Sequence, residues 1–261
     1  MRSRSARALL ALALAALLGA CAAGSAATDG SVLRIAAAAD LRFALPEILR
    51  EYRAAHPGVR VTVSYGSSGT LAAQLANRAP FDVYLSADLA YARGLESTGL
   101  VAPDGLFTYA RGRIVVWVRE DSPLEVERHG LRVLLDPAVR MIAIANPEHA
   151  PYGRAAVAAL ERAGIYERVK DRLVLGENIA QTAEYVSSGA ADVGIIALSL
   201  ALAPGAGGRY ALIPSELHLP IVQGGAILPW ASDPAAARAF VDLLLGPSGR
   251  RILARYGFEE P

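Results

Sequence analysis

The chain has 261 residues, of which 53% are hydrophobic and 20% charged, and its 26 basic side chains nearly balance its 25 acidic ones. A nucleic-acid-binding protein normally carries a basic excess or a basic stripe, so this balance argues against that class. A chain of this length and apolar content can bury one large core or two smaller ones.

The amino-terminal segment has the layout of a secretory signal. Arg2, Arg4 and Arg7 precede an unbroken run of small and apolar residues that is too short to span a membrane as a mature helix. The run ends in Leu18-Gly19-Ala20-Cys21, which resembles the lipobox of bacterial lipoproteins, and Cys21 is the single cysteine of the chain. We therefore expect a lipoprotein signal peptide over residues 1–21, a lipid on Cys21 and a small-residue tether over residues 22–30.

From residue 32 onward, short β-rich runs alternate with helical stretches. Strands are expected at 32–37, 59–64 and 82–86, each followed by a helix, of which the third covers 89–97. This alternation predicts an α/β fold of mostly parallel strands with helices on both faces. Ligands of such sheets bind at the carboxyl ends of the strands, where helices begin.

A second series of the same kind follows. Strands are expected at 113–118, 141–145, 173–175 and 193–197, with helices at 153–163 and 180–188. Two cores fit this length better than one long sheet. The last segment, with a strand near 224–228 and a helix at 234–245, is too short for a third domain and is expected to complete one of the two.

Four of the strand-to-helix junctions are small, polar or both. They cover residues 36–41, 66–70, 146–153 and 176–179. Each exposes backbone N–H groups at a helix start, where an anion can be bound. If two junctions belong to each lobe and the lobes face one another, their donors converge on one bound group.

The junction at Gly66-Ser67-Ser68-Gly69-Thr70 carries three hydroxyls and no charge. Ser and Thr cap helices by accepting bonds from the first free N–H groups, so capping explains these residues as well as anion binding does. The two interpretations stay open at this point.

Seven motifs in order resemble one family, the molybdate-binding type of extracytoplasmic solute-binding proteins. The motifs are AAAADL, YGSSGTLAAQL, FDVYLSAD, NPEHAPYG, GENIAQT, DVGIIALS and LLLGPSGRRILARYGF. The resemblance implies a type II periplasmic-binding-protein fold, in which two α/β lobes joined by a two-strand hinge close around a tetrahedral oxyanion. By that analogy lobe 1 comprises residues 31–109 and 214–261, and lobe 2 comprises residues 110–213.

The resemblance also implies the ligand-binding residues. Ser68 is expected to contribute its hydroxyl and N–H, Ile179 its backbone N–H, and Tyr152 its backbone N–H with or without its phenol. Neutral dipoles at helix starts can hold a desolvated dianion and still release it, whereas an adjacent Arg would bind it more tightly.

Two positions depart from the family pattern. Many members have a Tyr where this chain has Ala197, and Tyr152 is placed to supply the missing phenol. Asp40 falls where relatives usually have Ser or Asn. An ionised carboxylate within about 4 Å of a dianion would be repelled by several kcal/mol in a partly dry site. Asp40 therefore caps its helix, accepts a proton from a protonated oxyanion such as hydrogen phosphate or hydrogen arsenate, or lies further from the ligand than in relatives.

Other functions find weaker support. A secreted serine hydrolase using Ser67 or Ser68 with His149 would need Gly-x-Ser-x-Gly, which the sequence misses by one position. Four tyrosines, Tyr65, Tyr109, Tyr152 and Tyr210, leave a ferric-ion cleft conceivable, but none are adjacent. The scattered histidines have no metal-ligand spacing.

The sequence therefore predicts a non-enzymatic, extracytoplasmic and lipid-anchored binding protein. Its ligand is expected to be molybdate or tungstate, with phosphate, arsenate or sulfate as alternative oxyanions. Its expected partners are an ABC transporter permease and, through the anchor, a membrane. We expect no cofactor, no bare metal cation and no nucleic acid, and we expect a monomer.

Overall fold

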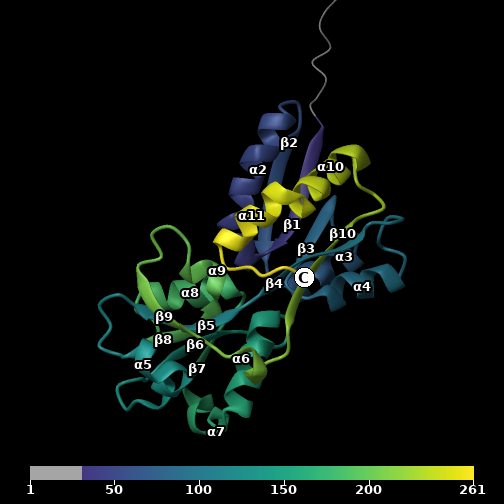
Figure 1. Ribbon diagram of the computed structural model, residues 1–261. Coiled ribbons are helices and arrows are strands. Elements are labelled where there is room, and N and C mark those ends of the chain that lie inside the picture. Colours follow the sequence, from purple (N-terminus) through teal and green to yellow (C-terminus); the bar gives the residue numbers. More distant parts are fainter. Residues whose placement is uncertain (1–30) are drawn as a thin grey trace, which may run out of the picture. The chain divides into compact units, whose positions relative to one another are not determined.

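The computed structural model describes residues 31–261 (Figure 1). The expected signal peptide, tether and lipidated Cys21 lie outside these residues. The described chain forms two five-stranded sheets, each with its own helices. We call them the first lobe, which carries the purple to blue strands of Figure 1 and the yellow-green strand of residues 221–227, and the second lobe, which carries the teal to green strands.

The first sheet has the spatial order β2-β1-β3-β10-β4. Its strands are β1 Val32–Ala38, β2 Arg60–Gly66, β3 Val83–Ser86, β4 Leu106–Gly112 and β10 Ile221–Ile227. Its helices are α2 Ala44–Ala55, α3 Ser68–Ala76, α4 Leu89–Ser97, α10 Pro234–Leu245 and α11 Pro247–Arg255.

The second sheet has the order β7-β6-β8-β5-β9. Its strands are β5 Ile114–Arg119, β6 Ile142–Ala145, β7 Leu173–Gly176, β8 Val193–Ala197 and β9 Gly208–Leu212. Its helices are α5 Val126–His129, α6 Pro151–Arg162, α7 Tyr166–Val169, α8 Ile179–Ser187 and α9 Leu198–Ala201. Short 3-10 turns cover Ala39–Leu41, Gly130–Leu135, Lys170–Arg172 and Ser215–Leu217.

One strand in each sheet runs against the other four. In the first sheet β10 is antiparallel to both β3 and β4, and in the second β5 is antiparallel to both β8 and β9. The remaining pairs are parallel, as expected from the alternation of strands and helices. The chain enters the second sheet after Gly112 and returns to the first at Ile221, and these two residues pair with each other. The two crossings therefore start from neighbouring points, which is the arrangement of a hinge.

Apolar side chains cover both faces of the first sheet. In β1, Leu33, Ile35 and Ala37 join the core beneath α2, α10 and α11, whereas Ala36 joins the core beneath α3 and α4. This alternation follows from the two-residue period of a strand. In the second lobe, β5, β6 and β8 are buried almost throughout, as strands covered on both faces are.

The helix after β1 begins later than its sequence pattern suggests. The chain first makes the 3-10 turn Ala39–Leu41, and α2 starts only at Ala44. Pro46 thus lies in the first turn of α2, where its missing N–H removes no helical hydrogen bond. The turn presents its backbone to the carboxyl end of the sheet.

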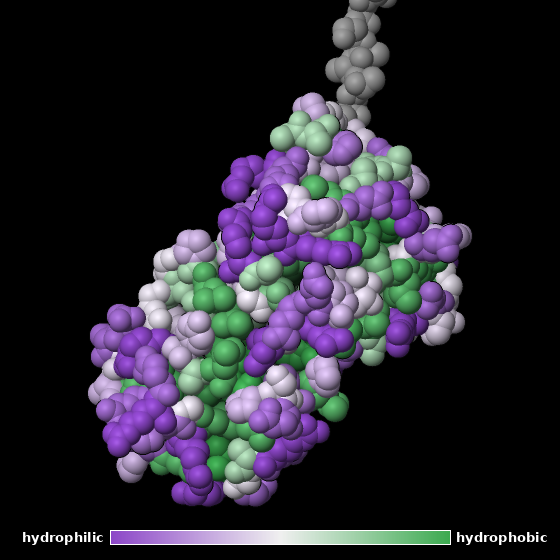
Figure 2. Space-filling view, viewed as in Figure 1, coloured by the Kyte–Doolittle hydropathy of each residue, from purple (hydrophilic) through white to green (hydrophobic). Residues whose placement is uncertain are grey.

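Hydrophilic side chains gather over α2 and α11 on the face drawn in Figure 2. There Glu47 of α2 pairs with Arg255 and accepts a hydrogen bond from the Tyr256 hydroxyl. Within residues 31–261, none of the helices has the length and apolar character needed to span a membrane.

Candidate functional site

The four junctions singled out in the sequence meet at one small cavity between the lobes. It is lined by Ala38, Ala39, Asp40, Gly66, Ser67, Ser68, Ala87, Ala150, Pro151, Tyr152 and Ile179. Its volume is about 10 Å³, which is space for one water molecule. The four residues expected to bind the ligand are among those that line it, and they come from both lobes.

Three helix starts each leave one backbone N–H without an acceptor among the described residues. Ser68 opens α3, Tyr152 is the second residue of α6, and Ile179 opens α8. Such positions have no acceptor inside their own helix. The N–H groups that follow are occupied. Thr70 donates to Ser67 Oγ in α3, Ala180 and Gln181 donate to Asn178 Oδ1 in α8, and in α6, which has no side-chain cap, Gly153 donates to the Ala150 carbonyl. These three N–H groups are therefore left without an acceptor at residues that line the cavity.

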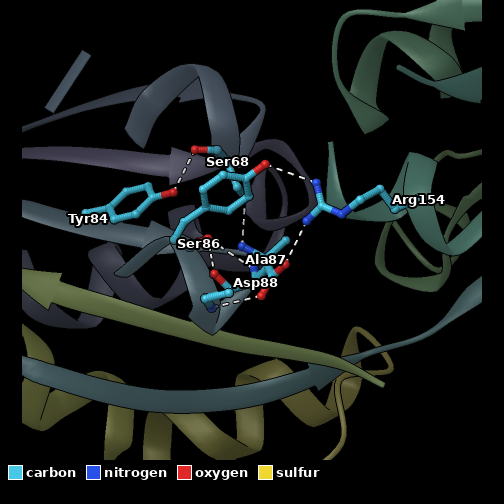
Figure 3. A network of polar contacts seen from close by, with 8 residues as sticks. Ser68, Tyr84, Ser86, Ala87, Asp88 and Arg154 are labelled. Carbon is cyan, nitrogen blue, oxygen red and sulfur yellow. Dashed lines mark hydrogen bonds and ion pairs between the residues drawn. The ribbon is translucent and has the colours of Figure 1, made fainter. Parts of the chain in front are cut away.

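The Ser68 hydroxyl is positioned as a further donor (Figure 3). Its oxygen accepts a hydrogen bond of 2.9 Å from the backbone N–H of Ala87 through one of its two lone pairs, and its proton has no acceptor among the described residues. The Ser68 carbonyl accepts a 2.7 Å bond from the Tyr84 hydroxyl, which fixes the backbone. The N-cap of α3 is Ser67, whose hydroxyl also donates to Thr70 Oγ1. Ser67 therefore caps α3, and the hydroxyl proton of Ser68 has no acceptor among the described residues.

Asp40 makes a buried contact between the lobes. It is 1% exposed, and its Oδ2 accepts a 2.8 Å bond from the Tyr152 hydroxyl of α6 and a 2.5 Å bond from Gln223 Nε2 of β10. Gln223 Nε2 also donates to the Tyr152 hydroxyl oxygen at 2.9 Å. Asp40 Oδ1 has no partner among the described residues.

These contacts bear on two expectations. No side-chain cap is formed at the 3-10 turn or at α2, and the Asp40 carboxylate faces Tyr152, while smaller contributions from the backbone N–H groups of Asp40 and Leu41 also lower its pKa. In this arrangement the Tyr152 phenol directs its proton to Asp40. The reason is electrostatic, since a buried carboxylate is the strongest acceptor within reach.

Burial sets the protonation of this group. It raises the pKa of Asp40 to about 6, against the lowering effect of the bonds from Gln223 and Tyr152. Burial and the charge of Asp40 raise the pKa of Tyr152 and of Tyr109 well above the ordinary value. Both phenols are therefore neutral, which argues against iron-binding tyrosinates.

Further contacts join the lobes around the cavity. The backbone N–H of Gly69 donates to the His149 carbonyl at 2.9 Å, and the Ser199 hydroxyl donates to the Asp40 carbonyl at 2.8 Å. At the rim, Arg154 of α6 bonds to Asp88 at 2.7 Å (Figure 3). Arg154 also donates to the Tyr91 hydroxyl at 3.0 Å. The structure is thus that of a closed pair of lobes.

The geometry does not assemble a hydrolase. Among the described residues, no hydrogen bond joins the His149 side chain to Ser67 or Ser68, whose oxygens engage Thr70 and Ala87. The described residues also contain no group of three His, Cys, Asp or Glu side chains placed to hold a metal ion.

Sequence reasoning missed two contributors. Gln223 is fully buried in β10, and a lone polar residue within the apolar run Ile221–Ile227 was the available signal. Ala87 acts through its backbone N–H, which orients the Ser68 hydroxyl. A backbone donor cannot be predicted from the pattern of side chains in the sequence.

Known proteins share this fold and much of this sequence. The family model described as "Bacterial extracellular solute-binding protein" matches residues 33–259. The molybdate-binding protein ModA of Azotobacter vinelandii is 37% identical over 251 residues, or 95% of this chain and 96% of that protein. The solved periplasmic molybdate-binding protein of Azotobacter vinelandii matches with a TM-score of 0.81 and 31% identity, covering 88% of this chain and 99% of the other. The putative ABC transporter substrate-binding lipoprotein YvgL of Bacillus subtilis (strain 168) is 27% identical over 247 residues, 93% of each chain.

Proposed function

This chain belongs to the family of bacterial extracellular solute-binding proteins, and on that premise we propose that it captures molybdate or tungstate for an ABC transporter permease. Members of this family bind solutes and are not enzymes. Relatives named as molybdate-binding proteins, at 37% and 35% identity, support the choice of ion.

One observation carries the proposal: donors from both lobes converge on one cavity. Ser68, Tyr152 and Ile179 line it, and their backbone N–H groups and the Ser68 hydroxyl proton have no acceptor within residues 31–261. A tetrahedral oxyanion has four oxygens to accept such bonds, and the positive ends of α3, α6 and α8 favour its charge.

The donors near the cavity are neutral, which suits capture followed by release. The arginine of the nearby rim, Arg154, is already paired with Asp88. A ring of dipoles binds a desolvated dianion by geometry, and a ring sized for long metal–oxygen bonds leaves the smaller sulfate loosely bonded. We expect molybdate and tungstate to be preferred for that reason.

Binding proceeds by hinge closure. Residues 31–109 with 214–261 are proposed to move as one lobe and residues 110–213 as the other. The cavity has space for one water molecule, so the ion enters while the lobes are apart. Both lobes must then supply donors before the ion is fully desolvated, so the right ligand stabilises the closed form.

Isothermal titration calorimetry of residues 31–261 tests the function. Molybdate, tungstate, sulfate, phosphate, arsenate and ferric ion are titrated separately at several pH values. We expect tight one-to-one binding of molybdate and tungstate and much weaker binding of the others. Failure of every ion to bind below the micromolar range contradicts the proposal.

A second candidate ligand is a monoprotonated oxyanion, hydrogen phosphate or hydrogen arsenate. The unpartnered Oδ1 of Asp40 supports it, since that oxygen can accept the proton of such an ion. Phosphate binding that disappears in Asp40→Asn would favour this candidate over molybdate.

We also propose that the mature protein is monomeric and is anchored by a lipid on Cys21. The lipobox-like sequence and the lipoprotein name of the relative YvgL support the anchor. Mass spectrometry of membrane-extracted protein should show a diacylglyceryl mass on Cys21 that is lost in Cys21→Ser. An unmodified Cys21 in the wild type contradicts the anchor.

A further inference from the structure

The two oxygens of the Asp40 carboxyl group have different surroundings. Oδ2 is saturated by the Tyr152 hydroxyl and Gln223 Nε2, whereas Oδ1 is buried and has no partner among the described residues. Asp40 lines the same cavity as the three free N–H groups. Oδ1 is therefore the oxygen left to meet a bound ion, and it is also the oxygen on which an added proton would sit.

We propose that Asp40 binds the oxyanion as a neutral carboxylic acid, with its proton on Oδ1 donated in a hydrogen bond to an oxygen of the fully ionised dianion. The solvent supplies the proton, so binding at neutral pH takes up one proton for each ion. The inference rests on the proposed oxyanion function and assigns Asp40 the donor role that Ser or Asn would fill.

Electrostatics favours this state over an ionised Asp40. A carboxylate within about 4 Å of a dianion in a partly dry site costs several kcal/mol of repulsion, whereas the acid form adds a donor. Burial has already raised the pKa of Asp40 to about 6, so the proton is available close to neutrality. A bound dianion raises that pKa further.

No cation neutralises Asp40 from the elements packed around it, within the part of the chain that the structure describes. Tyr152 of α6 and Tyr109 of β4 are neutral phenols, and Gln223 of β10 is an amide. The nearest cation in sequence, Arg42, pairs with Glu184 of α8 at 2.7 Å, and Ser199 of α9 reaches only the Asp40 carbonyl. Because no cation among the described residues pairs with the Asp40 carboxylate, its negative charge can be removed only by protonation.

The sign of the pH dependence follows. Without an ion in the cavity, Asp40 is half protonated near pH 6. With the ion bound, Asp40 stays protonated to a higher pH. Between these two pKa values each rise of one pH unit weakens binding up to tenfold, and below about pH 6 the affinity levels off.

Calorimetric titration of sodium molybdate at pH 6, 7 and 8, in two buffers of different ionisation enthalpy, tests the inference. For the wild type we expect uptake of close to one proton per ion at pH 7 and a Kd that rises with pH. In Asp40→Asn the amide donates at every pH. We expect no proton uptake, a flat pH profile and binding at least tenfold tighter than wild type at pH 8.

Two further variants make the test decisive. Asp40→Ser should also lose the pH dependence, and thermal melting establishes that each variant is folded. Glu148→Gln removes an exposed carboxylate of the same junction as Tyr152 and should keep the wild-type profile.

The possible failures are distinguishable. Tight molybdate binding with a flat profile and no proton uptake in the wild type overturns the acid form of Asp40 while leaving the proposed function intact. A second result also overturns the acid form of Asp40. In it, phosphate is the one oxyanion that binds, its binding takes up no proton from the buffer, and Asp40→Asn abolishes that binding. The absence of binding by any oxyanion at every pH overturns the proposed function itself.

Discussion

Two contacts between the lobes differ in burial and in what they can do. The inner contact joins Asp40 to Tyr152 and Gln223, with Asp40 1% exposed. The rim contact joins Arg154 to Asp88, with side chains 40% and 33% exposed. Water screens the rim pair, so it forms and breaks at little cost in free energy. The inner contact is shielded from water, so its energy changes strongly when Asp40 gains or loses a charge.

This difference in burial indicates where selectivity resides. A charge pair at the rim holds the lobes together with any ligand or none. The inner contact lies against the cavity, so on the proposed function its protonation is coupled to the charge of the ligand. We therefore expect the inner contact to select the ion and the rim contact to contribute only to holding the lobes closed.

The largest effect is expected where the backbones of the two lobes meet. A Cβ on Gly69 would lie 2.8 Å from the His149 carbonyl oxygen and 2.7 Å from the Tyr91 hydroxyl. Gly69→Ala should therefore prevent full closure and weaken molybdate binding by about 3 kcal/mol, measured by calorimetry. Gly94→Ala, whose Cβ meets nothing within 4 Å, is the matched helix control and should bind like wild type. Unchanged molybdate affinity in Gly69→Ala would show that binding does not need the close contact between the backbones at Gly69 and His149.

Replacing Asp40 by Asn isolates the inner contact in the ligand-free protein. The pKa of Asp40 in the folded chain, about 6, lies above its ordinary value of 3.8, so folding favours the protonated form. That contribution is present at low pH and is lost as the pH rises through 6. Asp40→Asn should therefore be more stable than wild type by about 2–3 kcal/mol at pH 8 and by less than about 1 kcal/mol at pH 4. Urea denaturation measures both, and an equal difference at the two pH values would refute the shift.

Ser68 tests the donors directly. Its hydroxyl proton has no acceptor among the described residues, so Ser68→Ala should weaken molybdate binding by about 2 kcal/mol. Ser67→Ala removes the cap of α3 and should lower stability by about 1 kcal/mol with little change in affinity. If the two variants exchanged these effects, the assignment of the adjacent serines would be reversed.

The smallest effect belongs to the rim. Arg154→Ala should reduce the affinity for molybdate by less than about 1 kcal/mol, because the ion pair with Asp88 is partly solvated. The loss should shrink further at high salt, where exposed charges are screened. A salt-independent loss as large as that of Ser68→Ala would assign Arg154 to the ligand rather than to the rim.

Sequence patterns predicted the fold better than they predicted the inner contact. The two-lobed α/β fold followed from the alternation of apolar strands and amphipathic helices, and the solved relative confirms it. The strands β4 and β9 were not predicted as separate elements, because their Gly and Arg residues weaken the strand pattern. The roles of Ser68, Tyr152 and Ile179 remain predictions, although all three reach the same cavity.

The surroundings of Asp40 lay beyond sequence reasoning. Its partners are 112 and 183 residues away in the chain, and its place just after a strand equally fits a helix cap. Local propensity favours Asp as a cap, but the fold brings a phenol and an amide to it across the lobes, and those contacts prevail.

Binding of the ion by both lobes can be seen in a crystal of residues 31–261 grown with sodium molybdate and measured at the molybdenum absorption edge. We predict one anomalous peak in the cavity, with ion oxygens about 2.7–3.2 Å from the N–H groups of Ser68, Tyr152 and Ile179. A peak elsewhere, or contacts from one lobe only, would contradict the claim that donors of both lobes hold the ion.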